Sequence, residues 1–454
     1  MELKTSLYNN IYSFSSIKEV LAKANEKKSG DTLAGVGAKS DLERVAAKVV
    51  LADLTVKDIT ENPAIDYDKD SVTRIILDDL DKEIYEQVKG ITIGDLREYI
   101  LDSKRTSGEL LTLSKGLSSE LIASVCKLMS NLDLMYVSSK LEVTAHCNTT
   151  IGKIGTFSSR LQPNHPTDSV KGVTSSLLEG LSYGVGDAVL GLNPAVDTLE
   201  STSDILNLFN DVKTRLEIPT QICVLSHITT QMKALEKGVP MDLCFQSIAG
   251  SEISLASFGV TVNMLKEAND MMKEKSTAQG PNYMYFETGQ GSELSSNGHG
   301  GADQQTMEAR CYGLARHYKP FLVNTVVGFI GPEYIYDTKE LIRASLEDIF
   351  CGLFHGLPMG CDICYTNHMK ADQNDVDSLL VMLASSGCRY VMGVPEGDDI
   401  MLMYQSTGFH DIATVREMLN KRPIREFENW LEKFGIMENG KLTELAGDPT
   451  IFMQ

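Results

Sequence analysis

The sequence predicts an α/β fold: a closed (β/α)8 TIM barrel with a helical N-terminal extension and a short helical C-terminal section. Eight short β-rich segments recur between residues 149 and 394, and stretches with helical periodicity separate them. Strands that alternate with helices along one chain pair in parallel, because each parallel crossover needs a dozen or more residues. Most of the eight segments also run directly into a glycine, an acid, an amide or a basic residue. The active site of such a barrel lies at the carboxyl ends of its strands, so these polar groups are expected to carry the chemistry.

The barrel units define a predicted catalytic domain over residues 141–405. Its strands are expected at residues 156–160, 188–193, 221–227, 243–246, 283–287, 322–329, 358–362 and 390–394. Its helices are expected at residues 169–179, 199–216, 230–237, 255–275, 302–317, 338–353 and 375–386, where apolar residues recur at helical spacing.

Two helical sections are predicted to flank the barrel. In the N-terminal region, residues 1–140, Ser16 with Glu19 and Ser40 with Glu43 have the spacing of capping boxes, which mark helix starts. Helical spacing continues there over residues 71–88 and 110–134. The C-terminal section, residues 406–454, is expected to contain helices near 412–419 and 425–433, with Pro423 between them.

Composition excludes several classes of protein. The chain has 454 residues and a formal net charge of −20, which argues against nucleic acid as a partner, since phosphate binding needs a basic surface. No apolar run approaches the roughly 18 residues that cross a bilayer, and the first residues lack the layout of a secretion signal. The nine cysteines are irregularly spaced, as in a protein of the reducing cytosol. We therefore expect a cytoplasmic protein without a membrane segment.

Three local patterns have simpler explanations than a site. Glycines at residues 35–37 do not follow a predicted strand, so they indicate a loop between helices and not a phosphate-binding turn. Cys361 and Cys364 have metal-ligand spacing, and His368 is near them, but a structural zinc site normally needs a second such pair. His227 ends the third predicted strand without any accompanying metal-binding histidine motif, which favours a structural role. No metal site is predicted.

Glu287 is the most distinctive polar residue. It ends an aromatic strand and opens the glycine-rich segment 288–292, where a ligand can approach the main chain closely. A carboxylate in such a place is partly desolvated and needs a partner. Arg160 at the first strand end and a cationic substrate are both candidates, and Asp362 at the seventh strand end adds a second negative charge. A structural Arg–Glu pair that braces the barrel remains an equal alternative.

Three amides accompany these charges. Gln162, Asn193 and Gln246 lie at or just past the first, second and fourth strand ends. Amides both donate and accept hydrogen bonds, which suits a small substrate with hydroxyl or amine groups. Together with the carboxylates and the guanidinium they indicate a small, polar, cationic ligand.

At these residues the chain resembles the large subunit of ethanolamine ammonia-lyase. The resemblance extends over essentially the whole chain and is most specific over residues 285–292, 320–334 and 397–402. It implies an adenosylcobalamin-dependent ammonia-lyase that converts ethanolamine to acetaldehyde and ammonia by a radical migration of the amine followed by elimination.

The resemblance also implies particular site residues and partners. Substrate-binding positions fall on Arg160, Gln162, Asn193, Glu287 and Asp362, of which Arg160, Glu287 and Asp362 are the expected catalytic residues. Cobalamin-contacting positions fall on Pro194, Gln246, Ser295 and Met401. A separate small subunit is expected to complete the cofactor site, together with self-association of large subunits and a reactivating factor. The expected location is the cytoplasm, either free or inside a bacterial microcompartment.

Two other functions are compatible with the residue types. A barrel lyase or aldolase without a cofactor could act on another small amino alcohol or polyol, although no predicted strand ends on the lysine that Schiff-base chemistry needs. A scaffold or shell component is the other alternative. It would have no reason to gather Arg160, Glu287 and Asp362 at one barrel mouth.

Overall fold

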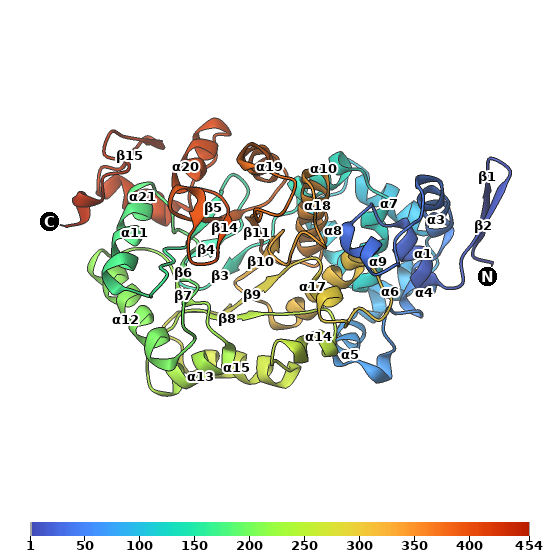
Figure 1. The fold of residues 1–454 in the computed structure, drawn as a ribbon, viewed down its shortest axis with the longest axis horizontal. Coiled ribbons are helices and arrows are strands. Elements are labelled where there is room, and N and C mark those ends of the chain that lie inside the picture. The colour runs from blue at the N-terminus through green and yellow to red at the C-terminus, as the bar shows by residue number, and fades with distance from the viewer. Residues whose placement is uncertain (1, 454) are drawn as a thin grey trace.

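The computed structural model describes residues 2–453, and its centre is the predicted barrel (Figure 1). Each of the eight predicted segments overlaps one strand of a single parallel sheet, so the predicted sheet is confirmed. The strands are β5 (Ser158–Leu161), β6 (Val189–Leu192), β7 (Ile222–Val224), β8 (Cys244–Ser247), β9 (Met284–Thr288), β10 (Leu322–Val327), β11 (Met359–Ile363) and β12 (Tyr390–Gly393).

The sheet curls into a nearly closed barrel. Strands pair in chain order from β5 to β7 and from β8 to β12, and β12 returns to β5 with Tyr390 opposite Ser158. β7 and β8 are not joined by a ladder, but the N–H of Leu243 donates to the carbonyl of Ile222 at 3.2 Å where these strands begin. All eight carboxyl ends therefore point to one face of the molecule.

A ring of helices covers the barrel. It consists of α11 (Val170–Ser182), α12 (Leu199–Arg215), α13 (Ile228–Glu236), α15 (Val262–Lys275), α17 (Gln304–Tyr318), α18 (Thr338–Phe354), α19 (Gln373–Ser385) and α20 (Phe409–Met418). The single helix predicted over residues 255–275 is wrong, because α14 (Glu252–Ser257) precedes α15. Gly259 adopts a left-handed conformation with φ of +72°, which ends α14, and the Thr261 side chain then caps α15. Beyond the ring lies α21 (Arg425–Lys433), at the predicted position.

The N-terminal region is largely helical, as predicted, and lies on one side of the barrel (blue and cyan in Figure 1). Ser16 and Ser40 cap α1 (Ile17–Ala24) and α3 (Asp41–Asp53). The reciprocal half of each predicted capping box is wrong, since Glu19 and Glu43 accept from the N–H one residue before the cap. The other helices are α2 (Ser29–Leu33), α4 (Val56–Thr60), α5 (Ser71–Asp78), α6 (Lys82–Val88), α7 (Ile93–Leu101), α8 (Ser107–Ser114), α9 (Ser119–Lys127) and α10 (Asn131–Lys140).

Sequence periodicity missed several short strand pairs and several helix breaks. A hairpin of β1 (Lys4–Leu7) and β2 (Asn10–Ser13) projects from the end of the N-terminal region (Figure 1). Its strands are short and mostly exposed, so they carry no alternating apolar signal. The helical spacing over 71–88 and 110–134 is divided among α5 and α6, and among α8, α9 and α10, because Asp81 and Ser130 each cap a new helix.

Buried ion pairs attach the N-terminal region to the barrel helices. Lys28 Nζ lies 2.7 Å from a carboxylate oxygen of Glu347 on α18, and both side chains are 0% exposed. Arg343 holds the other Glu347 oxygen at 2.6 Å, and the two cations keep the pKa of Glu347 at about 2 despite burial. Removing one partner of such a pair leaves a buried charge uncompensated.

Two further expectations concern single segments. Residues 35–37 lie in the loop between α2 and α3, as predicted. Within residues 2–453, no helix combines the length and the apolar character needed to span a lipid bilayer.

We predict that Lys28→Met lowers the free energy of unfolding by about 3 kcal/mol, at the low end of the range for broken buried pairs, because Arg343 still neutralises Glu347. Urea unfolding followed by circular dichroism measures the change. Lys27→Met is the matched control, since Lys27 is exposed, and it should change stability little. Equal effects of the two substitutions would contradict the importance of the buried pair.

Candidate active site

A cavity of about 380 Å³ opens at the carboxyl ends of the barrel strands. Five of the residues that the sequence analysis singled out line it: Arg160, Asn193, Gln246, Glu287 and Asp362. The remaining lining residues are Ser247, Ile248, Phe258, Thr288, Ser292, Val326, Phe329, Ile330, Leu402 and Tyr404. The cavity therefore combines a few convergent polar groups with apolar walls, as sites for small molecules do.

Arg160 and Glu287 form an ion pair across the barrel, from β5 to β9. Arg160 Nη1 donates to Glu287 Oε1 at 2.7 Å, and the arginine side chain is 1% exposed. Nη1 also donates to the hydroxyl of Tyr285, while Nη2 reaches Asn193 Oδ1 at 3.4 Å. Burial works against the guanidinium charge, but the contacts with the Tyr285 hydroxyl and the Glu287 carboxylate hold the pKa of Arg160 above its usual value. Arg160 is thus a permanent cation of the site.

Glu287 keeps one oxygen free. Its Oε1 accepts from Arg160, from the Tyr285 hydroxyl at 2.6 Å and from Asn324 Nδ2 at 3.2 Å. No hydrogen bond within the described chain reaches Oε2, and the side chain is 12% exposed in a residue that lines the cavity. Tyr285 and Glu287 are two residues apart on β9, so strand geometry turns both side chains to the barrel interior. Burial raises the pKa of Tyr285 well above its usual value, so it remains a neutral donor.

Asp362 is the second carboxylate of the cavity. The Tyr404 hydroxyl donates to its Oδ2 at 2.7 Å, and the Ser406 hydroxyl donates to its Oδ1 at 2.6 Å. Burial raises the pKa of Asp362 to about 6, against the opposing effects of the Ser406 hydrogen bond and the nearby Arg160 charge. Asp362 is therefore mostly ionised at neutral pH but titrates within the physiological range.

Gln162 lies behind the cavity wall. Its Nε2 donates to Asp399 at 2.6 Å and to the Tyr404 hydroxyl at 3.2 Å, and its Oε1 is buried without a partner. It is not among the cavity-lining residues, although Tyr404 in contact with it is.

The four expected cofactor positions lie on the same face as the cavity. Pro194, Gln246, Ser295 and Met401 follow or end β6, β8, β9 and β12. In this structure Gln246 braces the barrel: its Oε1 accepts from the N–H of Ile228 at 3.0 Å, and its Nε2 donates to the Ser247 carbonyl at 3.0 Å. Phe329, which lines the cavity, is exposed, and apolar side chains are also exposed at Val196, Ile253, Ile400 and Met403, in segments that follow β6, β8 and β12.

The simpler explanations of two sequence patterns agree with the structure. Cys361 and Cys364 are buried, His368 is exposed, and these residues do not converge on a common point that could hold a metal. All nine cysteines are buried and unpaired. His227 caps α13 through the Thr229 N–H, and its Nε2 lies 3.1 Å from the Phe258 carbonyl, so its role is structural.

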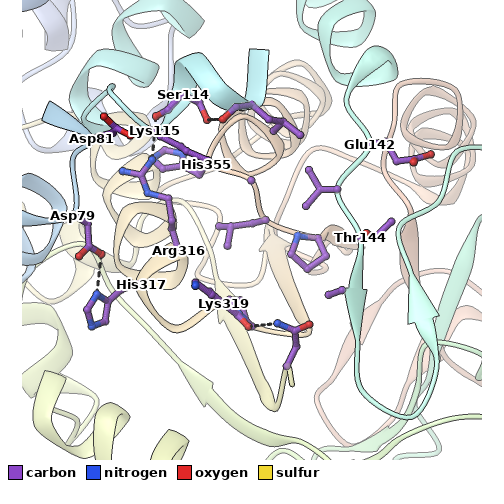
Figure 2. A pocket seen from close by; sticks show the side chains of 18 residues that line it. Asp79, Asp81, Ser114, Lys115, Glu142, Thr144, Arg316, His317, Lys319 and His355 are labelled. Atoms are coloured by element: carbon purple, nitrogen blue, oxygen red, sulfur yellow. Dashed lines mark hydrogen bonds and ion pairs between the residues drawn. The ribbon is translucent and has the colours of Figure 1, made fainter. Parts of the chain in front are cut away.

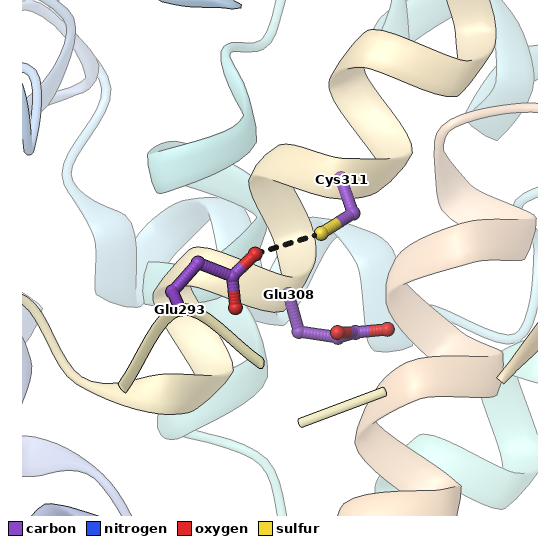
Figure 3. Close-up of side chains that lie close together, drawn as sticks. All are labelled: Glu293, Glu308 and Cys311. Carbon is purple, nitrogen blue, oxygen red and sulfur yellow. Dashed lines mark hydrogen bonds between the residues drawn. The ribbon is translucent and has the colours of Figure 1, made fainter. Parts of the chain in front are cut away.

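Residue spacing missed a buried acidic cluster next to the cavity. Ligand atoms of Glu293, Glu308 and Cys311 lie within 4.8 Å of one another, and the Cys311 thiol donates to Glu293 at 3.1 Å (Figure 3). Burial raises the pKa of both glutamates, and it raises the pKa of neighbouring Asp348 to about 7. The Oε2 atoms of both glutamates are buried without a hydrogen-bond partner within the described residues.

A second cavity, of about 900 Å³, lies at the opposite end of the barrel, where β9, β10 and β11 begin (Figure 2). Two of its basic side chains are engaged in structural contacts. His317 Nδ1 lies 2.8 Å from Asp79, and Arg316 donates to the Ser114 carbonyl at 3.2 Å. None of the predicted site residues lines it.

The fold and the first cavity define a barrel enzyme whose site presents two carboxylates and one guanidinium to a small cationic substrate. A family model described as ethanolamine ammonia lyase large subunit (EutB) matches residues 12–445. The ethanolamine ammonia-lyase large subunits of Escherichia coli K12 and Salmonella typhimurium LT2 are each 55% identical over 452 residues, covering 100% of both chains. The chain belongs to the ethanolamine ammonia-lyase large subunit family. A crystal structure of HydG, a maturase of the FeFe-hydrogenase, aligns with 75% of this chain and 78% of that one at 12% identity and a TM-score of 0.43, too low to bear on the function.

Four residues of the constellation were not assigned roles from residue spacing: Tyr285, Asn324, Asp399 and Tyr404. Tyr285 and Asn324 could have been found, because Tyr285 is two residues before Glu287 and Asn324 is its register partner on β10. Asp399 and Tyr404 lie in the loop after β12, where no periodicity reports side-chain direction.

We predict that Glu308→Gln weakens the pH dependence of stability. The raised pKa of Glu308 means that the folded protein binds its proton more tightly than the unfolded chain does, so wild-type stability falls as the pH rises above about 4.5. Thermal melting at pH 5 and pH 8 should show a smaller loss in the variant, by about 1.4 kcal/mol for each unit by which the pKa is raised. Exposed Glu274→Gln should retain the wild-type slope. An unchanged slope in Glu308→Gln would refute the assignment.

Proposed function

We propose that this chain is the catalytic large subunit of an ethanolamine ammonia-lyase, which converts ethanolamine to acetaldehyde and ammonia. The observation that carries the proposal is the convergence of Arg160, Glu287 and Asp362 on one cavity in a chain 55% identical to such subunits over its full length. Ethanolamine is an ammonium ion with a neighbouring hydroxyl group. The site offers charges and hydrogen bonds of the matching kind to both ends.

The ammonium end is matched by acceptors. Glu287 Oε2 has no partner within the described chain, and Asp362 is ionised at neutral pH. A cation between two carboxylates in a partly desolvated cavity restores the charge balance that burial disturbs. The free Oε1 of Gln162 adds a neutral acceptor behind them.

The hydroxyl end is matched by Arg160 and Asn193. Arg160 Nη2 makes only a long contact, 3.4 Å, to Asn193 Oδ1, so its N–H groups are available for a substrate oxygen. A permanent guanidinium stabilises negative charge that develops on that oxygen as the amine leaves its carbon.

Glu287 is the residue best placed to hold or move a proton during amine migration. Its Oε1 is fixed by three donors while Oε2 faces the cavity, so the carboxylate is rigid and still able to accept a proton at one atom. It lies against Arg160 at the hydroxyl end and belongs to the acceptor set at the ammonium end. Proton transfer by a positioned carboxylate contributes about 100-fold to 10,000-fold in rate.

The residues at the mouth fit the cofactor that the family uses, adenosylcobalamin. The corrin is broad and amphipathic, and the exposed apolar side chains at Val196, Phe329 and Ile400 offer it a matching rim. Pro194, Gln246, Ser295 and Met401 would hold it there. When bound, adenosylcobalamin supplies a carbon-centred radical able to remove hydrogen from the substrate. The apolar walls of the cavity exclude water and other groups that would quench such chemistry.

The proposal includes partners and a location. The relatives are named large subunits, so we propose a small-subunit partner that completes the cofactor site over the same rim. Self-association of large subunits and a reactivating factor are further proposed partners. We propose a cytoplasmic location, either free or within a bacterial microcompartment.

The cofactor-free alternative lacks its central residue. No lysine lines the cavity among residues 2–453, so Schiff-base chemistry has no amine to use there. Ultraviolet–visible spectra of the complex with adenosylcobalamin distinguish the two reactions. Formation of cob(II)alamin on adding ethanolamine is the expected result, and acetaldehyde release without any spectral change would favour the cofactor-free reaction.

We predict that Glu287→Gln reduces kcat/KM for ethanolamine by at least about 100-fold, because the amide cannot accept the proton and no longer balances the ammonium charge. Acetaldehyde release by the complex with the small subunit and adenosylcobalamin measures this. Exposed Glu333→Gln is the control and should retain wild-type turnover. A Glu287→Gln protein that binds cobalamin and turns over at a near-normal rate would refute the assigned role.

We predict that the purified chain with adenosylcobalamin alone is nearly inactive, because the side of the cofactor site that the small subunit is proposed to complete would remain open to water. Adding the small subunit should restore acetaldehyde release. Full activity of this chain by itself would overturn the proposed partnership.

A further inference from the structure

Asp399 is a buried carboxylate with four neutral donors. It ends β13 (Asp398–Asp399), in the loop after the last barrel strand, and is 3% exposed. Its Oδ1 accepts from the N–H groups of Met401 at 3.0 Å and Leu402 at 2.8 Å. Its Oδ2 accepts from Gln162 Nε2 at 2.6 Å and Asn164 Nδ2 at 2.7 Å.

These contacts fix the orientation of the Gln162 amide. An ionised carboxylate only accepts hydrogen bonds, so Gln162 must turn its NH₂ group toward Asp399. The same NH₂ group donates to the Tyr404 hydroxyl, which in turn donates to Asp362. Asp399 and Asp362 thus accept hydrogen bonds from Gln162 and from Tyr404. The only polar side-chain atom of Gln162 without a partner is the acceptor Oε1.

Asp399 also helps to position Asn193, the second amide residue expected to bind the substrate, through Asn164. Asn164 uses its NH₂ group on Asp399, which leaves its Oδ1 to accept from the backbone N–H of Asn193 at 2.8 Å. The Asn193 side chain contacts Arg160 and lines the cavity. One carboxylate therefore sets the hydrogen-bond direction at the ends of both β5 and β6.

We propose that Asp399 is a positioning residue that makes Gln162 an acceptor and thereby selects an ammonium-bearing substrate. This inference rests on the proposed function. With Asp399 ionised, Gln162 Oε1, Glu287 Oε2 and Asp362 are all acceptors, which matches the donors of an ammonium group. A reversed Gln162 amide would present its N–H groups to the substrate ammonium group. The donors of the amide and of the ammonium would then both lack acceptors, and binding sites reject a wrong ligand through such unpaired polar groups.

The test is Asp399→Asn in the complex with the small subunit and adenosylcobalamin. The N–H groups of Met401 and Leu402 hold the oxygen of the introduced amide, so its NH₂ group faces Gln162 and Asn164. It reverses the Gln162 amide and removes the acceptor of Asn164. The KM for ethanolamine should rise by about 10-fold to 100-fold, as expected for a lost hydrogen bond to a charged group, with a smaller change in kcat. Asp398→Asn is the matched control at an exposed neighbour and should keep the wild-type KM.

A compensating variant separates positioning from a structural role. It combines Asp399→Asn with Gln162→Glu, which leaves the total charge unchanged. One oxygen of the carboxylate introduced at position 162 accepts from the NH₂ group introduced at position 399, and the other oxygen faces the ammonium. The double variant should have a KM at least about 3-fold below that of Asp399→Asn, because Gln162→Glu restores an acceptor at that position while the Asn164 contact stays lost. Such a partial recovery is the non-additivity expected of contacting residues.

The outcomes are distinct. A wild-type complex that does not act on ethanolamine ends the proposed function. An active wild type with an unchanged KM in Asp399→Asn, or a raised KM that the double variant does not recover, overturns the role of Asp399. Should the single variant fail to fold, Gln162→Glu alone becomes the reference. A KM lower in the double variant than in Gln162→Glu supports positioning, and an equal or higher KM overturns it.

Discussion

The site depends on one buried ion pair, Arg160 with Glu287. The two residues are 127 positions apart in the chain and come from β5 and β9, so only a barrel that curls nearly closed brings them within 2.7 Å. Tyr285 bonds to both, which removes the freedom of either side chain to turn to another partner. The pair costs desolvation energy, and breaking it would cost more, because a buried charge would remain alone. The consequence is a carboxylate held rigidly by one oxygen with the other left for the substrate.

The other polar groups extend this arrangement in a consistent direction. Asp362 accepts hydrogen bonds from Tyr404 and Ser406, and Asp399 accepts one from Gln162. The polar atoms near the cavity that have no partner are therefore mainly acceptors. Arg160 and Asn193 are the exceptions, at the end expected to meet a hydroxyl oxygen. In the proposed function, the acceptors bind the ammonium group of the substrate, and Arg160 and Asn193 bind its hydroxyl oxygen. Buried pairs between the N-terminal region and α17 and α18, such as Lys28 with Glu347, hold the helices that support β9 and β10.

Much of this follows from the sequence, and the rest fails for identifiable reasons. The eight strands could be predicted because buried parallel strands are short apolar runs at regular spacing. Glu287, Asp362 and Arg160 could be assigned to one rim because each ends such a run. The hairpin at Lys4–Ser13 could not, since its exposed strands bury too little to leave a pattern. Asp399 and Tyr404 could not either, because their directions are set by contacts of an irregular loop with β5 and β11. The break at Gly259 was hidden by apolar residues that fit one continuous helix.

The central claim, that two carboxylates grip an ammonium ion, is tested most directly by the pH dependence of ethanolamine affinity. Ethanolamine can be titrated calorimetrically into the complex of this chain with its small subunit and cyanocobalamin, which does not turn over. Asp362 has a pKa of about 6 and binds the cation only when it is ionised. The Kd for ethanolamine should therefore rise about tenfold for each unit by which the pH is lowered below 6, and it should be constant above about pH 7. An Asp362→Asn complex should show no such slope. An ethanolamine Kd that is the same at about pH 5 and about pH 7.5 in the wild-type complex would contradict the account.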